Sequence, residues 1–143
     1  MPRDTQQKEA IRLAFIKADR PLSVDEIFKL ARNEVAGLGI ATVYRNLKAL
    51  QGEKFIQPVD LPGQTCRWEI APGGHHHHFL CRTCDKLYEI HDCPQDLARL
   101  IPEGYTLEEH DILLRGQCKA CSQKMKTKKH LGRNNSNTRS LKD

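Results

Sequence analysis

Apolar residues in the first fifty positions recur every three or four residues, which is the period of amphipathic helices. A first helix is predicted over residues 5–18, with an apolar face of Ile11, Ala14, Phe15 and Ala18. Pro21 interrupts this pattern, and the capping-box motif Ser23 to Glu26 predicts the start of a second helix. The inner face of that helix is expected to consist of Ile27, Leu30, Ala31 and Val35. A turn at residues 37–39 leads into a third helix over residues 41–53, which buries Val43, Leu47 and Leu50.

Shorter apolar runs follow, and these are typical of strands. Residues 55–60 and 66–70 flank the turn sequence LPGQT and predict a hairpin. Further strands are predicted over residues 86–93 and 105–118, with a short helix from about Pro94 between them. Two helices joined by a Gly-containing turn and followed by a hairpin are the pattern of a winged helix-turn-helix. The predicted fold class is α+β, a winged helix-turn-helix followed by a small α/β part.

The third predicted helix leaves polar and aromatic residues off its buried face: Thr42, Tyr44, Arg45, Asn46 and Lys48. In a helix-turn-helix the second helix enters the major groove, where Arg and Asn read base edges and Lys contacts phosphate. These residues are the candidates for DNA binding. The same pattern also fits a small helical bundle with an ordinary charged face, so the helices alone leave both interpretations open.

Two Cys-x-x-Cys motifs lie in the second half of the chain, Cys81 with Cys84 and Cys118 with Cys121. Four thiolates can close a tetrahedral structural zinc site, so the motifs predict a four-cysteine zinc centre. The N-terminus lacks the features of a secretory signal, and no apolar segment is long enough to span a membrane. We therefore expect a cytoplasmic protein, in which cysteines bind metals more often than they form disulfides.

Four consecutive histidines, His75 to His78, precede the first of these motifs. Alternate side chains of a strand point to opposite faces, so His76 and His78 would share one face and the other two the opposite face. The run therefore predicts two metal sites back to back, with the carboxylates of Glu69 and Glu89 nearby. Imidazole and carboxylate ligands suit zinc, iron or manganese, whereas thiolate favours zinc. A solvated polar strand end is the alternative interpretation.

The chain of 143 residues has a net charge of +5 that is unevenly distributed. Basic residues exceed acidic ones over residues 1–54 and 122–143, and acidic residues exceed basic ones over residues 55–121. This favours a polyanionic partner at one end of the chain and bound cations in the centre. The segment 122–143 has almost no large apolar residues and is predicted to be a disordered basic tail.

The order and spacing of these motifs resemble the ferric uptake regulator (Fur) superfamily of bacterial metal-sensing repressors. The resemblance rests on GLGIATVYRNLKAL, HHHHFLCRTCDKLYEI and EEHDILLRGQC with its final Cys-x-x-Cys, and it extends from about residue 5 to residue 121. It implies a winged-helix DNA-binding domain over residues 1–60, with the wing reaching about residue 70. It also implies a zinc-containing α/β domain over residues 71–121 that forms a homodimer. Only the basic tail lies outside it.

The resemblance implies three ligand sets. The structural Zn²⁺ would be held by Cys81, Cys84, Cys118 and Cys121. A regulatory Zn²⁺ or Fe²⁺, with Mn²⁺ as a further candidate, would be bound by Glu69, His76, His78 and Glu89. A second site would consist of His75, His77, Asp96 and His110. Tyr44 and Arg45 match the residue pair with which the family contacts operator DNA.

One position departs from the family pattern. Members often supply a regulatory-site histidine from the loop before the second helix, but this chain has Pro21 there and no histidine before His75. Cys66 is the first candidate to replace it and would favour zinc, with Asp60 as a weaker candidate; a lone cysteine is as readily a small buried hydrophobe. Cys93 lacks a Cys-x-x-Cys partner, and the sequence leaves its role open between packing and redox sensitivity.

The predicted function is metal-dependent repression of metal-uptake or homeostasis genes by a homodimer on double-stranded DNA with an A·T-rich palindromic operator. A peroxide- or manganese-responsive regulator of the same family is the alternative. From another class, a zinc-binding hydrolase or a metal-buffering protein is considered. The hydrolase is disfavoured because the chain has no HExxH motif, and no enzymatic activity is predicted.

Overall fold

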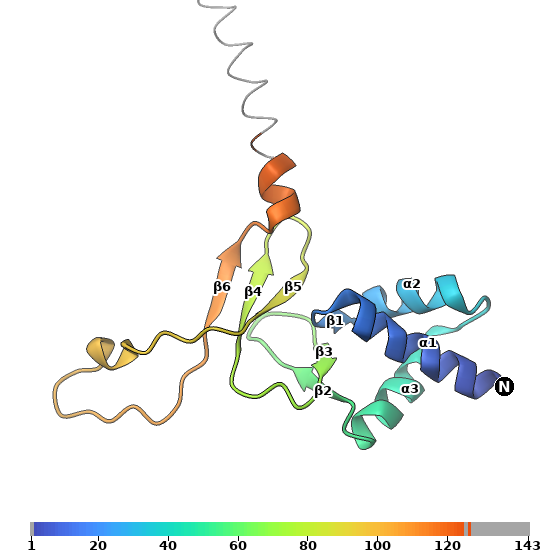
Figure 1. The fold of residues 1–143 in the computed structure, drawn as a ribbon, viewed down its shortest axis with the longest axis horizontal. Coiled ribbons are helices and arrows are strands. Elements are labelled where there is room, and N and C mark those ends of the chain that lie inside the picture. The colour runs from blue at the N-terminus through green and yellow to red at the C-terminus, as the bar shows by residue number, and fades with distance from the viewer. Residues whose placement is uncertain (1, 125, 127–143) are drawn as a thin grey trace, which may run out of the picture.

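The computed structural model describes residues 2–124 and residue 126, and it has an α+β fold with two small sheets (Figure 1). The elements in chain order are α1 (Arg3–Ala18), β1 (Leu22–Ser23), α2 (Val24–Glu34), α3 (Ile40–Gly52), β2 (Ile56–Val59), β3 (Arg67–Ile70), β4 (His77–Cys81), β5 (Leu87–Ile90), the 3-10 helix η1 (Leu97–Leu100) and β6 (Leu113–Gly116). The predicted fold class is confirmed.

The N-terminal helices begin close to where the sequence predicts. Ser23 is the N-cap of α2, and its Oγ accepts a hydrogen bond from the Glu26 N–H at 3.3 Å. In return, Glu26 Oε1 accepts one from the Ser23 N–H at 3.3 Å, which confirms the capping box. Gly37 makes the turn between α2 and α3 with a φ of +79°, a conformation that residues with side chains rarely adopt.

The helices and the first sheet share one apolar core. Its buried residues are Ala10, Ile11, Ala14, Phe15, Leu22, Ile27, Ala31, Leu38, Val43, Leu47, Leu50 and Ile56. The predicted inner face of α2 is only partly correct. Ile27 and Ala31 are fully buried, whereas Val35 is half-buried and Leu30 is 40% exposed. Leu30 instead lines a hollow of about 730 Å³ between the helices, the wing and the second half of the chain.

β3 is the central strand of the first sheet, which has the order β1-β3-β2. Both of its pairings are antiparallel, with Leu22 opposite Trp68 and Ile56 opposite Ile70. The predicted hairpin, β2 with β3, is thereby confirmed. The two-residue β1 was not predicted, because a strand of that length has no periodicity to read.

The second sheet has the order β5-β4-β6, in which β4 pairs antiparallel with β5 and parallel with β6. Its core is small, with Val59, Leu80 and Leu87 buried and Leu61 and Leu113 packed against them. Val59 on β2 and Leu61 in the turn between β2 and β3 both belong to the wing, so the second sheet packs directly on the first half of the chain.

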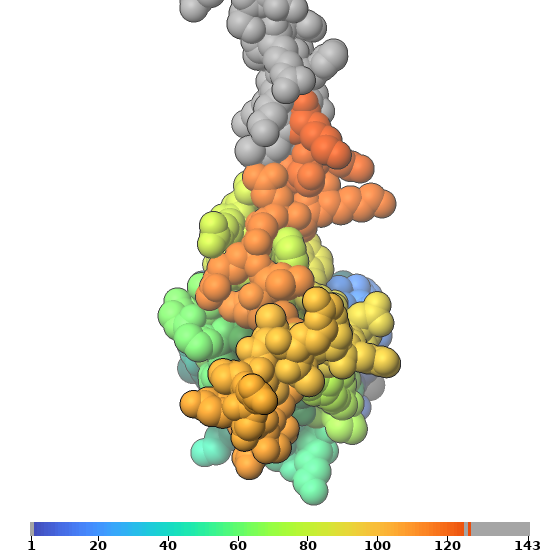
Figure 2. All heavy atoms as spheres, turned by 90° about the vertical axis from the view of Figure 1, so that its left-hand side faces the viewer, coloured from blue at the N-terminus to red at the C-terminus, as the bar shows by residue number. Residues whose placement is uncertain are grey.

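A long connection, residues 91–112, joins β5 to β6 and extends away from the sheet (Figure 1). It dominates the face of the molecule seen in Figure 2, in yellow to orange. The predicted strand over residues 105–118 is reduced to Leu113–Gly116, and the short helix starts at Leu97 rather than near Pro94. Several apolar side chains of this connection are exposed, among them Leu100 (79%) and Tyr105 (73%). Exposed apolar surface of this kind is typical of a protein interface.

Residues 119–124 are helical, so the predicted disorder does not hold for the first three residues of the basic tail. The rest of that tail, except residue 126, lies outside the described residues. Among the helices that the structure describes, none is long and apolar enough to cross a membrane.

The contrast within α2 makes a first prediction. Ile27→Ala should lower the free energy of unfolding by about 2–5 kcal/mol, because it opens a cavity in the helical core. Leu30→Ala, the matched control on the same helix, should change it by no more than about 1 kcal/mol. Urea unfolding followed by circular dichroism measures both, and equal losses would contradict the assigned core.

Candidate metal centres

Three groups of potential metal ligands lie in and beside the second sheet, within the part of the chain that the structure describes. In each group the ligand atoms all lie within 4.8 Å of one another. Their members are Cys81, Cys84, Cys118 and Cys121 in the first group, Glu69, His76 and His78 in the second, and His75, His77, Cys93 and His110 in the third.

The cysteine group is preorganised around Cys81, which is fully buried at the end of β4. Its Sγ accepts hydrogen bonds from the N–H groups of Cys84 at 3.4 Å and Cys118 at 3.3 Å. Burial alone would raise the pKa of Cys81, but these backbone bonds lower it to about 6. Since the thiolate is the form that binds zinc, the site suits a closed four-cysteine zinc centre.

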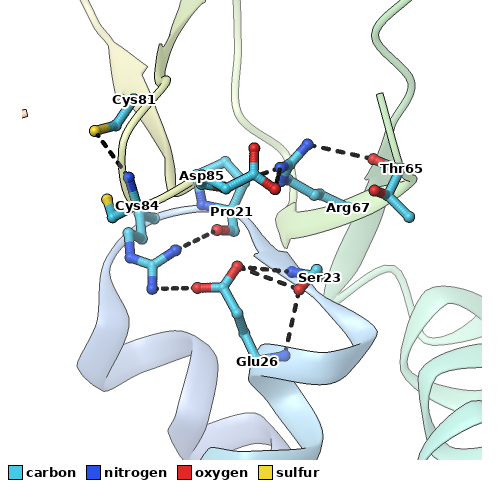
Figure 3. A network of polar contacts seen from close by, with 9 residues as sticks. Pro21, Ser23, Glu26, Thr65, Arg67, Cys81, Cys84 and Asp85 are labelled. Carbon is cyan, nitrogen blue, oxygen red and sulfur yellow. Dashed lines mark hydrogen bonds and ion pairs between the residues drawn. The ribbon is translucent and has the colours of Figure 1, made fainter. Parts of the chain in front are cut away.

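The turn that carries Cys84 is tied to the wing (Figure 3). The buried Arg67 on β3 donates hydrogen bonds to the Asp85 carbonyl at 3.0 Å and to the Thr65 carbonyl at 3.3 Å, and its guanidinium lies 3.5 Å from the Asp85 carboxylate. Asp85 directly follows Cys84, so the wing strand and the cysteine turn hold each other in place.

The second group joins the two sheets, because Glu69 lies on β3 and His78 on β4. The Glu69 carboxylate is 3% exposed. It contacts Nε2 of His76 at 2.9 Å and Nε2 of His78 at 3.1 Å, and it accepts a hydrogen bond from Gln57 Nε2 at 2.8 Å. The group also lines a cavity of about 450 Å³ that separates the wing from the start of β6.

His76 is oriented by the backbone. Its Nδ1 lies 3.0 Å from the carbonyl oxygens of Gly73 and Gly74, which can only accept, so Nδ1 carries a proton. A Cβ on Gly73 would lie 2.5 Å from the imidazole ring, so this close approach requires glycine. Nε2 then faces an ionised carboxylate that also only accepts, and this contact is favourable only with a second proton or a cation between them.

The acid–base properties of the group reflect this arrangement. Burial would raise the pKa of Glu69, but hydrogen bonds from His78, Gln57 and His76 lower it to about 2. Burial would lower the pKa of His76, but the hydrogen bonds to Glu69 and Gly74 raise it. Glu89 lies opposite His78 on β5, and its pKa is raised by burial and then by the adjacent Glu69 carboxylate. The Glu69 carboxylate and two imidazoles thus converge where a divalent cation would compensate the negative charge and bind the rings, whereas Glu89 lies beside Glu69 but outside the group.

Neither proposed replacement for the hinge histidine belongs to this group, although Asp60 lines the same cavity. Cys66 immediately precedes β3, and its Sγ donates to the Arg67 carbonyl at 3.6 Å. Burial first, and then Asp60, raise the pKa of Cys66, which keeps the thiol protonated. Pro21 is fully buried. The first sheet instead contributes Glu69 itself, so the group already includes a ligand from the wing.

The third group lies on the opposite face of the histidine strand, as the alternation predicts. Nε2 of His75 and of His77 each lie 3.3 Å from Cys93 Sγ, and Nε2 of His110 lies 3.0 Å from it. The structure corrects one member, because Asp96 lies outside the group and pairs with Arg99 at 3.1 Å. The unpaired Cys93 was the sequence signal for this position, and folding places it three residues after β5, beside the histidines.

His77 is the buried member of the third group, with 2% exposure. Burial lowers its pKa, and the neighbouring His75 and His110 lower it further, so the His77 imidazole is kept neutral. Its Nδ1 accepts a hydrogen bond from the Ile112 N–H at 3.2 Å, which leaves the ring proton on Nε2. A cation at Nε2 moves that proton to Nδ1, which can then no longer accept from the Ile112 N–H, and leaving this donor without its acceptor costs about 1–3 kcal/mol. Structural zinc binds with roughly 10–16 kcal/mol, so this contact does not prevent binding.

The helix α3 presents the predicted DNA-binding residues on its outer side. Tyr44 is 55% exposed, and Arg45 and Lys48 are exposed as well. Thr42 and Asn46 are half-buried, and Asn46 Nδ2 donates to the Thr42 carbonyl at 3.0 Å. Their role in DNA binding stays a prediction.

This combination of a winged helix with cysteine, histidine and carboxylate groups has known relatives. The model of the ferric uptake regulator family matches residues 2–115. The chain belongs to the ferric uptake regulator family. Members of this family are metal-responsive transcription regulators and not enzymes. Structures of the family bind zinc, iron or manganese, so these are the candidate metals for the three groups.

Individual relatives resemble most of the chain. The ferric uptake regulation protein of Bacillus subtilis is 27% identical over 127 residues, which are 84% of this chain and 85% of that protein. The solved ferric uptake regulator of Helicobacter pylori is 30% identical, with coverage of 81% and 79% and a TM-score of 0.59. A solved zinc-bound manganese uptake regulator is 25% identical, with coverage of 78% and 87% and a TM-score of 0.68.

The cysteine centre yields a second prediction. Cys84→Ser should release the zinc of this centre and unfold the end of β4, because one of the four thiolates is removed. Zinc content by mass spectrometry and thermal unfolding measure the effect. Cys66→Ser, a change at a half-buried cysteine outside all three groups, should retain the zinc; a Cys84→Ser protein with full zinc content would refute the assignment.

Proposed function

We propose that this member of the family is a metal-dependent DNA-binding repressor of metal-uptake or homeostasis genes. The protein would act as a cytoplasmic homodimer on an A·T-rich palindromic operator. Zn²⁺ at the four-cysteine centre would be structural, and Zn²⁺ or Fe²⁺ at Glu69, His76 and His78, with Glu89 beside them, would be regulatory. The three donor groups also invite comparison with the Helicobacter pylori protein, whose structure is described as having three functional metal binding sites.

One observation carries this proposal: the second group takes Glu69 from the wing and its histidines from the segment that leads into and forms β4. A cation bound there would hold the two sheets together. β3 pairs with β2, and β2 follows α3 after a short turn. A movement of β3 would therefore also move α3, the helix that carries Arg45. Coupling of this kind typically changes affinity by about 5- to 150-fold.

A homodimer would place two α3 helices at the spacing of two operator half-sites. The exposed apolar residues of the connection 91–112, together with Leu114 on β6 (50% exposed), support an interface on the second half of the chain. This also supports a division into a DNA-binding part over residues 1–60, with its wing, and a dimerisation part over residues 71–121.

The donor types of the second group do not choose among the candidate regulatory metals. Imidazole and carboxylate ligands without thiolate are compatible with iron, zinc and manganese, and the position of Cys66 outside the group removes the argument that favoured zinc. A manganese- or peroxide-responsive regulator is therefore retained as the alternative. A metal-buffering protein would bind the same ions but no duplex.

The regulatory group gives a third prediction. His76→Ala should keep the zinc of the four-cysteine centre and lose the metal-dependent increase in DNA affinity, because Glu69 loses its closest imidazole. Fluorescence anisotropy with a pool of A·T-rich palindromic duplexes, at fixed salt and buffered Zn²⁺, Mn²⁺ or anaerobic Fe²⁺, measures this.

His91→Ala is the matched control, because His91 is exposed at the edge of this group and lies 3.6 Å from Glu89. His76→Gln retains a hydrogen-bond donor for Glu69, so this variant separates the loss of the imidazole ligand from a folding defect. Unchanged metal dependence in His76→Ala would overturn the regulatory assignment. Failure of the wild-type protein to bind any duplex with each metal would favour the buffering protein.

The DNA-binding helix gives a fourth prediction. Arg45→Ala should weaken binding to the duplex by about 1–3 kcal/mol while the metal content stays constant, because Arg45 lies on α3 and away from all three metal groups. Arg99→Ala, an exposed arginine on η1, serves as the control of equal charge. An equal loss in both variants would point to nonspecific charge attraction instead.

A further inference from the structure

Cys93 occupies a position in the third group that the family resemblance assigned to a carboxylate. Its Sγ is the shared neighbour of three Nε2 atoms, at 3.3 Å from His75, 3.3 Å from His77 and 3.0 Å from His110. The nitrogens of His75 and His110 are themselves 3.1 Å apart. Four ligand atoms thus surround one point, and Asp96 is not among them.

These separations can be compared with those of a real zinc site. A tetrahedral zinc ion with its usual bonds to nitrogen and sulfur holds its ligand atoms about 3.3–3.6 Å apart. Four of the six separations in the third group are 3.0–3.3 Å and all six lie within 4.8 Å, so small shifts of the side chains create the full coordination sphere. With four protein ligands no open position remains, unlike the second group, which has three.

We propose that Cys93 is the fourth ligand of a closed centre of three histidines and one cysteine, which binds a tetrahedral divalent cation of the zinc type. A tetrahedral set of imidazole and thiolate ligands suits zinc and disfavours Mn²⁺, which prefers carboxylate, carbonyl and water oxygens. Occupancy of the centre therefore depends on a reduced and unmodified Cys93 thiol. This inference rests on the metal-binding half of the proposed function and not on DNA binding.

The centre has a structural consequence for the connection 91–112. Cys93 lies at its start and His110 near its end, and both meet His75 and His77 at the beginning of β4. A cation bound there would connect both ends of residues 91–112 to the sheet. This segment carries the exposed Leu100 and Tyr105, so the centre fixes the base of the surface that the proposed dimer would use.

A reactive thiol is the competing interpretation, since a single imidazole beside a cysteine can activate it as a nucleophile. One base suffices for that role. Here three imidazoles converge on the sulfur, and one of them, His77, is 2% exposed and unable to reach a substrate in solution. The arrangement encloses the sulfur as a ligand set does.

Cobalt spectroscopy tests the ligand directly. Wild-type protein that retains zinc in its four-cysteine centre is titrated with Co²⁺, and the near-ultraviolet sulfur-to-cobalt charge-transfer band and the tetrahedral visible bands are recorded. We expect Cys93→Ser to abolish the charge-transfer band. Its affinity for Co²⁺ should fall by on the order of 100-fold, since loss of a supporting group alone costs 10- to 100-fold.

Three variants serve as controls. Asp96→Ala and Cys66→Ser should keep the band, because neither residue belongs to the group. His76→Ala should keep it as well while losing metal-dependent DNA binding, which separates failure of this inference from failure of the proposed function. A band that survives in Cys93→Ser, or disappears in Asp96→Ala, overturns the inference.

Alkylation by iodoacetamide, mapped by mass spectrometry, provides a second readout in the unmodified protein. Zn²⁺ should protect Cys93 from alkylation and leave the rate at Cys66 unchanged. Rapid alkylation of Cys93 that Zn²⁺ does not slow would instead identify a reactive thiol and refute the centre of three histidines and one cysteine.

Discussion

A buried carboxylate at the junction of the two sheets is the constraint on which the rest of the structure depends. Glu69 is almost entirely removed from solvent, and leaving such a charge uncompensated costs several kcal/mol. The backbone holds the proton of His76 on Nδ1, so the contact between its Nε2 and Glu69 needs either a second proton or a cation. The contact between the two sheets therefore depends on whether a proton or a cation lies between His76 and Glu69. This dependence is the physical basis for a metal-responsive protein.

The strand β3 connects this junction to the remaining parts of the molecule. Arg67 and Glu69 lie two residues apart on the same face, where Arg67 holds the turn of the four-cysteine centre and Glu69 the histidines. On the other face, Trp68 packs against the helical core. One short strand therefore contacts two of the three candidate metal centres and the core on which the DNA-binding helix packs. The absent hinge histidine does not disconnect the DNA-binding half, because β3 already supplies Glu69.

The run of four histidines contributes to two ligand groups of different composition, one on each face of the strand. His76 and His78 face a carboxylate beside a cavity of about 450 Å³, an arrangement suited to a cation that exchanges with solution. His75 and His77 face Cys93 and His110, which leave no open position. Three ligands with an open approach and four ligands without one bind cations with different selectivity and lifetime. A regulatory and a structural role can thus share one strand without sharing ligands.

The sequence by itself determined the helices, the wing hairpin, the grouping of the four paired cysteines and the division of the histidines, because each rests on local periodicity or on spacing of a few residues. It misjudged Leu30, which the tertiary arrangement leaves facing a hollow, and Asp96, which pairs with Arg99 instead of the histidines. It left the roles of Cys66 and Cys93 open, since the neighbours of each depend on how the wing and the long connection 91–112 pack against the second sheet. Only the tertiary structure decided these points, because contacts between residues far apart in the chain follow from packing and burial, for which local sequence carries no signal.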